Sequence, residues 1–440
     1  MKLIKTSILL VFCLTLMSCN KVVLHSDVRQ IEGRSMKEQK MEQTSEKISM
    51  LFAKVKTVCV GRYLLVVPQD ATVSYGLTQI DFMPNAIYPN RAKETQTLEA
   101  EGWQRLKENN KSARLIRHGA GVIKGSWSMS YYEDDITEQM GNGAVSLTIP
   151  VGANAFLYGR EFQDRSALAK FPNAQELQDE ANKNHIPRNE QDAMSVLVDW
   201  ARKTRPRSDD EVPPDSGFCV PYGFIQDSTY QYRENIQVGI RFPSLPDVNF
   251  SISSENYSNI TGEDGWGILK RVKKQQTLSG DEYDGHFLRI GKAPLKSWVN
   301  GEEVLAKVKS TGGLDFTWNQ VGTNGSVANP NDLTIKMYTK VKGETIGASE
   351  TTSLTDDEAI ALWDKLLKGF GFRVPIQAAF QSSVGVGAPC PQTGMWYCEG
   401  VSPEQGIYMR KGDPMPGQSY NKEARANMQW HLIKPMGDDT

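Results

Sequence analysis

The stretch at residues 204–217 interrupts the hydrophobic patterning of the chain and divides it into two parts. It contains three prolines, dense charge and one large apolar residue, Val212. Prolines and solvated charges are typical of linkers between domains. The chain of 440 residues also exceeds what one hydrophobic core usually serves. We therefore predict two domains joined by a linker at residues 205–217.

Patterns in the first part predict an N-terminal α+β domain at residues 54–204. Residues 58–68 form an apolar, β-branched run ended by proline, which indicates a central strand. Residues 127–131 and 145–149 alternate between apolar and polar side chains, as strands with one buried face do. Two helices are predicted in addition, at residues 95–109 and 189–203.

The second part predicts a C-terminal α+β domain at residues 218–378. Alternation at residues 236–242 and 248–252 around a proline-containing turn indicates a β-hairpin. Thr355 and Glu358 have the spacing of a capping box, and apolar residues follow at helical spacing to Phe370. Two more strands are predicted at residues 314–318 and 333–337. Both domains should therefore contain a mainly antiparallel sheet with packed helices.

The N-terminus has the features of a lipoprotein signal peptide at residues 1–18. Two lysines precede a short apolar run, and Leu16-Met17-Ser18-Cys19 resembles the bacterial lipobox. The resemblance implies acylation of Cys19, and Asn20 is typical of the class sorted to the outer membrane. An ordinary cleaved signal with an accidental cysteine is the alternative. Both interpretations place the protein outside the cytoplasm, and residues 19–53 are polar enough to be a tether.

Four cysteines remain after the signal peptide and the lipidated cysteine are set aside. An even number of cysteines in an oxidising compartment indicates disulfides, and their spacing does not fit a zinc site. Cys390 and Cys398 are separated by a short loop, and elimination then pairs Cys59 with Cys219. The second bridge would join the opening strands of the two domains across the linker.

The C-terminal residues 379–440 have a composition of their own, with aromatic residues but few aliphatic ones. So few aliphatic side chains should not build an independent core. We therefore predict a disulfide-pinned extension that lies on a domain or on a partner.

Composition and motifs exclude several classes of function. The 50 basic and 52 acidic residues nearly balance, so there is no electrostatic signature of nucleic-acid binding. Residues 125–129 lack the last glycine of a nucleophile elbow, and no zinc-protease, Walker or dinucleotide-binding motif occurs. The five histidines are spread along the chain, and adjacent carboxylates point apart on regular elements. We predict no enzyme, no cofactor, and no catalytic or metal-binding residue.

A series of short motifs gives the chain a resemblance to a known family. They begin with Cys59-Val60-Gly61-Arg62-Tyr63 and end with Arg373-Val374-Pro375. Between them lie Gly217-Phe218-Cys219, Gly223-Phe224-Ile225, Phe242-Pro243, Pro246-Asp247-Val248, Gly301-Glu302-Glu303 and Ala361-Leu362-Trp363-Asp364. Over residues 54–375 the chain resembles the two-domain immunity proteins that neutralise type VI secretion phospholipase effectors of the fourth lipase class.

The resemblance implies a periplasmic inhibitor whose two domains grip a toxic lipase and keep it from opening onto lipid. We therefore expect an immunity lipoprotein, anchored to the outer membrane through Cys19, whose partner is a cognate secreted phospholipase-type effector. The sequence does not identify the residues that bind this partner. An envelope assembly or scaffolding lipoprotein is the alternative, and a lipoprotein hydrolase comes third.

Overall fold

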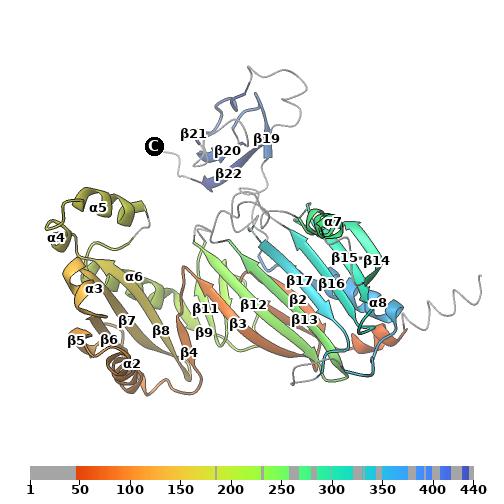
Figure 1. Ribbon diagram of the computed structural model, residues 1–440, viewed down its shortest axis with the longest axis horizontal. Helices are drawn as coiled ribbons and strands as arrows, with labels where there is room; N and C mark the ends of the chain where they lie inside the picture. Colours follow the sequence, from red (N-terminus) through yellow and green to blue (C-terminus); the bar gives the residue numbers. More distant parts are fainter. Residues whose placement is uncertain are drawn as a thin grey trace, which may run out of the picture.

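The computed structural model describes residues 46–435, apart from a set of short segments. These segments are residues 184–185, 229–231, 257–266, 279–284, 299, 321–329, 331, 343–348, 375–382, 391–392, 399–406 and 418–428. The predicted α+β class is confirmed, because antiparallel sheets with packed helices make up the structure (Figure 1).

The small domain, residues 86–203, is built on a five-stranded antiparallel sheet. Its strand order is β4 (Ala86–Tyr88), β8 (Asn154–Gln163), β7 (Asn142–Val151), β6 (Trp127–Tyr132) and β5 (Arg114–Ala120). The helices are α2 (Thr95–Asn109), α3 (Asp135–Met140), α4 (Arg165–Leu168), α5 (Ala174–Lys183) and α6 (Glu190–Lys203). The two helices and the strand pair β6–β7 predicted from periodicity are confirmed.

The large domain is built on a seven-stranded antiparallel sheet. Its strand order is β14 (Gly285–Lys292), β15 (Glu302–Val308), β16 (Leu314–Gln320), β17 (Asp332–Tyr338), β13 (Leu245–Glu255), β12 (Glu234–Phe242) and β3 (Thr72–Ile80). Helix α7 (Ile268–Leu278) packs near β15, and α8 (Asp356–Gly369) packs on the sheet through Trp363. The Trp363 ring lies 6.2 Å from Phe250 and 6.0 Å from Phe316, centroid to centroid. The capping box of Thr355 and Glu358 is present, as predicted.

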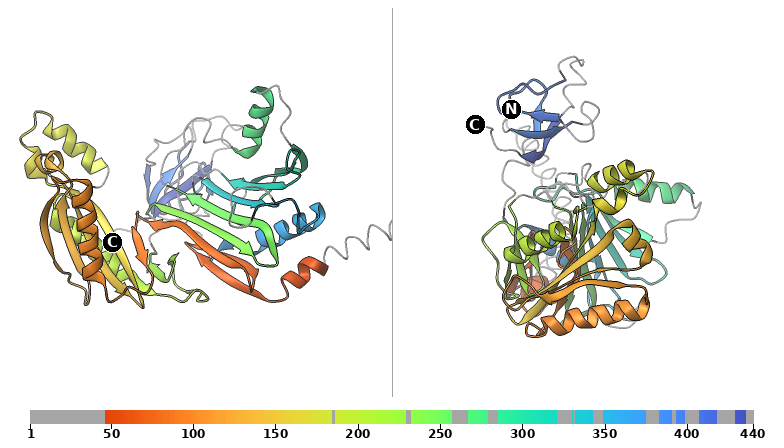
Figure 2. Two further views of the ribbon diagram at one scale, coloured as in Figure 1. Left: turned by 60° about the horizontal axis from the view of Figure 1, so that its bottom comes forward. Right: turned by 90° about the vertical axis from the view of Figure 1, so that its left-hand side faces the viewer.

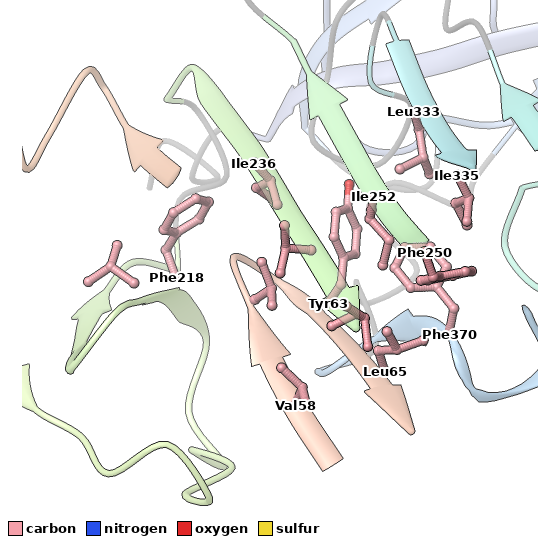
Figure 3. Packing of buried hydrophobic residues seen from close by; sticks show 14 of the residues in the cluster. Val58, Tyr63, Leu65, Phe218, Ile236, Phe250, Ile252, Leu333, Ile335 and Phe370 are labelled. Atoms are coloured by element: carbon pink, nitrogen blue, oxygen red, sulfur yellow. The ribbon is translucent and has the colours of Figure 1, made fainter. Parts of the chain in front are cut away.

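Two three-stranded sheets complete the large domain. The first joins β1 (Val55–Val60), β2 (Tyr63–Pro68) and β18 (Gly371–Phe372), and the second joins β10 (Gly217–Val220), β11 (Gly223–Gln226) and β9 (Thr204–Pro206). Figure 3 shows side chains from β1, β2 and β10 packed among those of β12, β13 and β17. One continuous core therefore connects segments that are far apart in the sequence.

The strand predicted at residues 58–68 is in fact a hairpin, because the chain reverses at Gly61. This glycine has φ of 55°, a left-handed conformation that other residues rarely adopt. A Cβ atom there would lie 2.2 Å from Cδ1 of Ile236. The turn thus requires a glycine both for its backbone angle and for close packing against β12.

The predicted domain boundaries also need correction. Strand β3, assigned to the domain at residues 54–204, pairs with β12 of the large domain, and β2 pairs with β18. The small domain is therefore an insertion between β3 and β9. The segment expected to be a linker is packed as well, because Arg207 is 5% exposed and donates hydrogen bonds to the carbonyls of Val220 and Gly223.

The end of the predicted tether belongs to the large domain too. Residues 46–51 are helical and bury Ile48 in the core. The Lys47 ammonium lies 3.0 Å from the Glu358 carboxylate at the start of α8. The tether is therefore shorter than residues 19–53.

The C-terminal residues form a separate module, in contrast to the prediction of an extension without a core. Its four-stranded sheet has the order β19 (Ser383–Gly385), β22 (Gln429–Pro435), β20 (Gly394–Tyr397) and β21 (Ile407–Met409). Figures 1 and 2 show it apart from the sheets of both domains. Cysteine, methionine and tryptophan take the place of aliphatic residues in its core: Cys390, Trp396, Cys398, Met409, Met415 and Trp430.

Candidate partner-binding surface

The junction between the small and large domains is held by polar contacts around Asp81. Its carboxylate lies 3.1 Å from the guanidinium of Arg160 on β8, and its backbone N–H donates to the carbonyl of Arg233 at 2.7 Å. Burial raises the pKa of Asp81, and the positive charge of Arg160 opposes this shift. Gln79 donates to the carbonyl of Pro84 at 3.0 Å. Of these contacts, the Asp81–Arg160 ion pair crosses from the large domain to the small one, and Figure 2 shows the two sheets side by side.

A second set of contacts holds the segment that follows the small domain, at residues 215–219, against the large domain. The predicted Cys59–Cys219 disulfide is confirmed, with an S–S distance of 2.00 Å and a Cα–Cα distance of 5.9 Å. It joins β1 to β10, and Gly61 and Cys219 exchange two backbone hydrogen bonds of 2.8 Å. Arg373 donates to the carbonyls of Asp215 and Gly217 at 2.6 and 2.8 Å. The end of the segment between the domains is therefore attached to the large domain at several points.

A buried ionic cluster lies beside these contacts. Arg62, at the turn of the β1–β2 hairpin, donates to Asp227 Oδ2 at 2.5 Å and to a carboxylate oxygen of Glu234. All three residues are at most 5% exposed. Burial raises the pKa of Glu234 to about 7, while Arg62 acts in the opposite direction. The cluster links the hairpin to the first residue of β12.

The small domain carries a groove on the face of its sheet that also packs against α2, and we call it the acidic groove. It consists of two adjoining cavities of about 370 and 580 Å³. Glu133, Ala144, Glu161 and Ile186 line both cavities, so they form one continuous depression. The sheet register explains this arrangement, because Ala144 on β7 pairs with Tyr131 on β6 and with Glu161 on β8.

The ends of the acidic groove differ in their lining. Toward the large domain it is lined by Phe82, which is 42% exposed, and by Tyr131. Toward α5 it is lined by Leu177 and Glu180. The groove thus runs from the domain junction to α5 and combines an apolar floor with carboxylates.

Carboxylates outnumber cations among the described side chains that line the acidic groove. Burial raises the pKa of Tyr131, and the negative charges of Glu133, Glu99 and Glu161 raise it further. Glu133, Glu161 and Glu180 are exposed, and no ion pair joins them to a lysine or arginine within the described part of the chain. Such a surface can attract a cationic partner.

Sequence reasoning missed this groove. Its acidic residues lie on β6, β8 and α5 or directly beside them, and only the sheet register brings them together. Glutamate is depleted in strands, so an exposed Glu161 within a strand pattern was the available signal.

The paired carboxylates and the histidines considered in the sequence analysis do not form a catalytic or metal-binding group within the described residues. Asp134 caps α3 and accepts from the Thr137 backbone N–H at 2.7 Å, and Asp356 lies 2.9 Å from Lys307. His118 and His286 are exposed on different sheets, β5 and β14. His25, His185 and the His431 side chain lie outside the described residues. Within the described residues no three His, Cys, Asp or Glu side chains are grouped to hold a metal ion.

The remaining predicted site residues are only partly covered by the structure. Cys390 and Cys398 are both 1% exposed and lie in the core of the C-terminal module, and their bridge stays a prediction. Cys19 lies outside the described residues, so its lipidation also stays a prediction. No helix in the part of the chain that the structure describes is long and apolar enough to cross a membrane.

Comparisons with known proteins identify relatives of this chain. The family described as the C-terminal domain of Tle cognate immunity protein 4 matches residues 211–375. A search of curated protein sequences finds no significant match. The apo structure of immunity protein TplEi of the type VI secretion system from Pseudomonas aeruginosa is similar at 22% identity, covering 72% of this chain and 97% of that one, with a TM-score of 0.52.

A second solved structure, the Tle4–Tli4 complex, contains a chain with the same degree of similarity. The identity is 22%, the coverage is 72% of this chain and 97% of that one, and the TM-score is 0.52. At this identity the likeness establishes the shared fold. Residues 211–375 thus match the family described as the C-terminal domain of Tle cognate immunity protein 4, and the chain shares the fold of the two solved structures.

Proposed function

We propose that this protein is an immunity protein that binds and inhibits a cognate type VI secretion lipase effector, without catalysing a reaction itself. The observation that carries the proposal is the match of residues 211–375 to the C-terminal domain of Tle cognate immunity protein 4. The similarity to a chain of the Tle4–Tli4 complex extends beyond this domain and covers 72% of the chain.

The architecture suits a stoichiometric inhibitor. The Asp81–Arg160 ion pair joins the small domain to the large one, and buried residues of both domains form one hydrophobic cluster. The disulfide joins two sheets within the large domain. A binding surface that is rigid before the partner arrives loses less conformational entropy on association. The protein acts in the periplasm in this proposal, and acylation of Cys19 holds it at the outer membrane.

Periplasmic co-expression tests the proposal. The cognate lipase effector is directed to the periplasm with this protein, with an unrelated lipoprotein, or alone, and lysis is followed. We expect lysis in the last two strains and survival in the first. Equal lysis in all three strains would contradict the proposal and favour the alternative of an envelope scaffold.

A further inference from the structure

The acidic groove differs in charge from two other cavities of the described residues. A cavity of about 490 Å³ beside α7 is lined by Asp315 and Asp332 but also by Arg271 and Lys336. A cavity of about 570 Å³ beside α6 is lined by Arg117 and Arg202, with Glu190 within 3.4 Å of Arg117. These two cavities therefore combine both signs of charge, whereas the rim of the acidic groove carries three glutamates. Among the described side chains that line the groove, the one cation is Arg160, which is paired with Asp81. Arg165 lies at its edge, where it donates to the Gln163 side chain and to the carbonyl of Ile186.

The shape of the groove favours a polypeptide segment over an ion. Its carboxylates are spread along two adjoining cavities and surround an apolar floor, so they do not converge on one point. Tyr131, Leu177 and Ile186 are only partly buried and offer apolar surface along the groove. An amphipathic segment with apolar residues on one face and lysine or arginine beside them complements both features.

We propose that the acidic groove binds a basic amphipathic segment of the effector, whose apolar side chains contact the floor and whose cations face Glu133, Glu161 and Glu180. This inference rests on the proposed function, since it assigns the surface that holds the lipase. Basic amphipathic segments bind membrane surfaces that carry anionic lipid, and some peripheral enzymes are anchored in this way. The groove offers the same combination of negative charge and apolar surface, so it competes with the membrane for this segment.

A peptide experiment tests the chemistry of the groove without the effector. The mature full chain with Cys19→Ser is titrated with a short lysine–leucine amphipathic peptide and with its glutamate–leucine counterpart, and binding is followed by fluorescence anisotropy. We expect only the basic peptide to bind. Anionic phosphatidylglycerol vesicles should compete for this peptide, and zwitterionic vesicles should not.

Two triple variants distinguish the effect of the groove carboxylates from the effect of the protein's net charge. Glu133→Gln/Glu161→Gln/Glu180→Gln should weaken binding about tenfold, because each exposed ion pair contributes about twofold. Asp70→Asn/Glu255→Gln/Glu350→Gln removes the same charge from exposed positions of the large domain and should bind as the wild type does. The difference should vanish at about 1 M salt. Equal binding of both peptides, or equal weakening by both triple variants, would overturn the inference.

A steric variant tests the same surface with the effector itself. Ala144→Lys places a long cationic side chain where the two cavities meet, and circular dichroism verifies that the variant is folded. We expect it to lose effector binding. If the wild type binds the effector and both Ala144→Lys and the groove triple variant bind equally well, the groove inference is wrong and the proposed function stands. If the wild type does not bind the effector, the proposed function fails, whatever the peptide result.

Discussion

Replacing Arg62 by methionine should destabilise the fold by about 3–5 kcal/mol, because it removes one partner of a buried ionic cluster. Arg62, Asp227 and Glu234 are 4%, 4% and 5% exposed, so water cannot readily replace the lost cation. Methionine retains much of the apolar volume of the arginine side chain. The loss of stability should therefore arise mainly from the carboxylates of Asp227 and Glu234, which remain buried without their cation.

The destabilisation should depend on pH through Glu234. Its pKa is raised from 4.5 to about 7 in the folded protein by burial. Between these two values the folded state keeps the proton while the unfolded state releases it, so this group lowers the stability as the pH rises through the window. Removing Arg62 removes the main opposing effect and raises the pKa of Glu234 further. The loss caused by Arg62→Met should therefore be larger at about pH 8 than at about pH 5.

Urea unfolding of the mature chain with Cys19→Ser, followed by circular dichroism at both pH values, measures this effect. Arg62→Met/Glu234→Gln should recover part of the stability at the higher pH, because the amide carries no charge. A loss below about 1 kcal/mol, or an equal loss at both pH values, would refute the reasoning and indicate that the cluster is hydrated.

Three further predictions concern local features. Cys59→Ser/Cys219→Ser should lower the stability by up to about 5 kcal/mol, the loop-entropy value for a separation of 160 residues. A folded variant with an unchanged urea midpoint would contradict this prediction. Non-reducing peptide mapping checks this bridge and the predicted Cys390–Cys398 bridge. Thr355→Ala should cost about 1 kcal/mol because it removes the cap of α8, whereas Thr355→Ser keeps the hydroxyl and should lose little. Cys19 should incorporate a palmitate analogue in cells, and label on a Cys19→Ala protein would exclude it as the lipidated residue.

Local features of the structure were predictable from the sequence, because neighbouring residues determine them. The capping box of Thr355 and Glu358 involves residues three positions apart. Strand positions in β6, β7, β12 and β13 follow from alternation. All of these elements are where the patterns indicate.

Features that depend on distant pairing were not predictable in this way. The pairing of β3 with β12 joins residues more than 150 positions apart, which no local pattern encodes, so the domain boundary was misplaced. The charge of Arg207 indicated a solvated linker, although backbone carbonyls satisfy its guanidinium in the interior. The acidic groove arises from the register of three strands and the position of α5, which no local pattern encodes.

Titrating the lipase activity of the purified effector with this protein tests the central claim most directly. The claim predicts a linear fall in activity that ends at one molar equivalent, with a stable complex of the two chains on gel filtration. Unchanged activity at molar excess, together with separate elution of the two proteins, would contradict it.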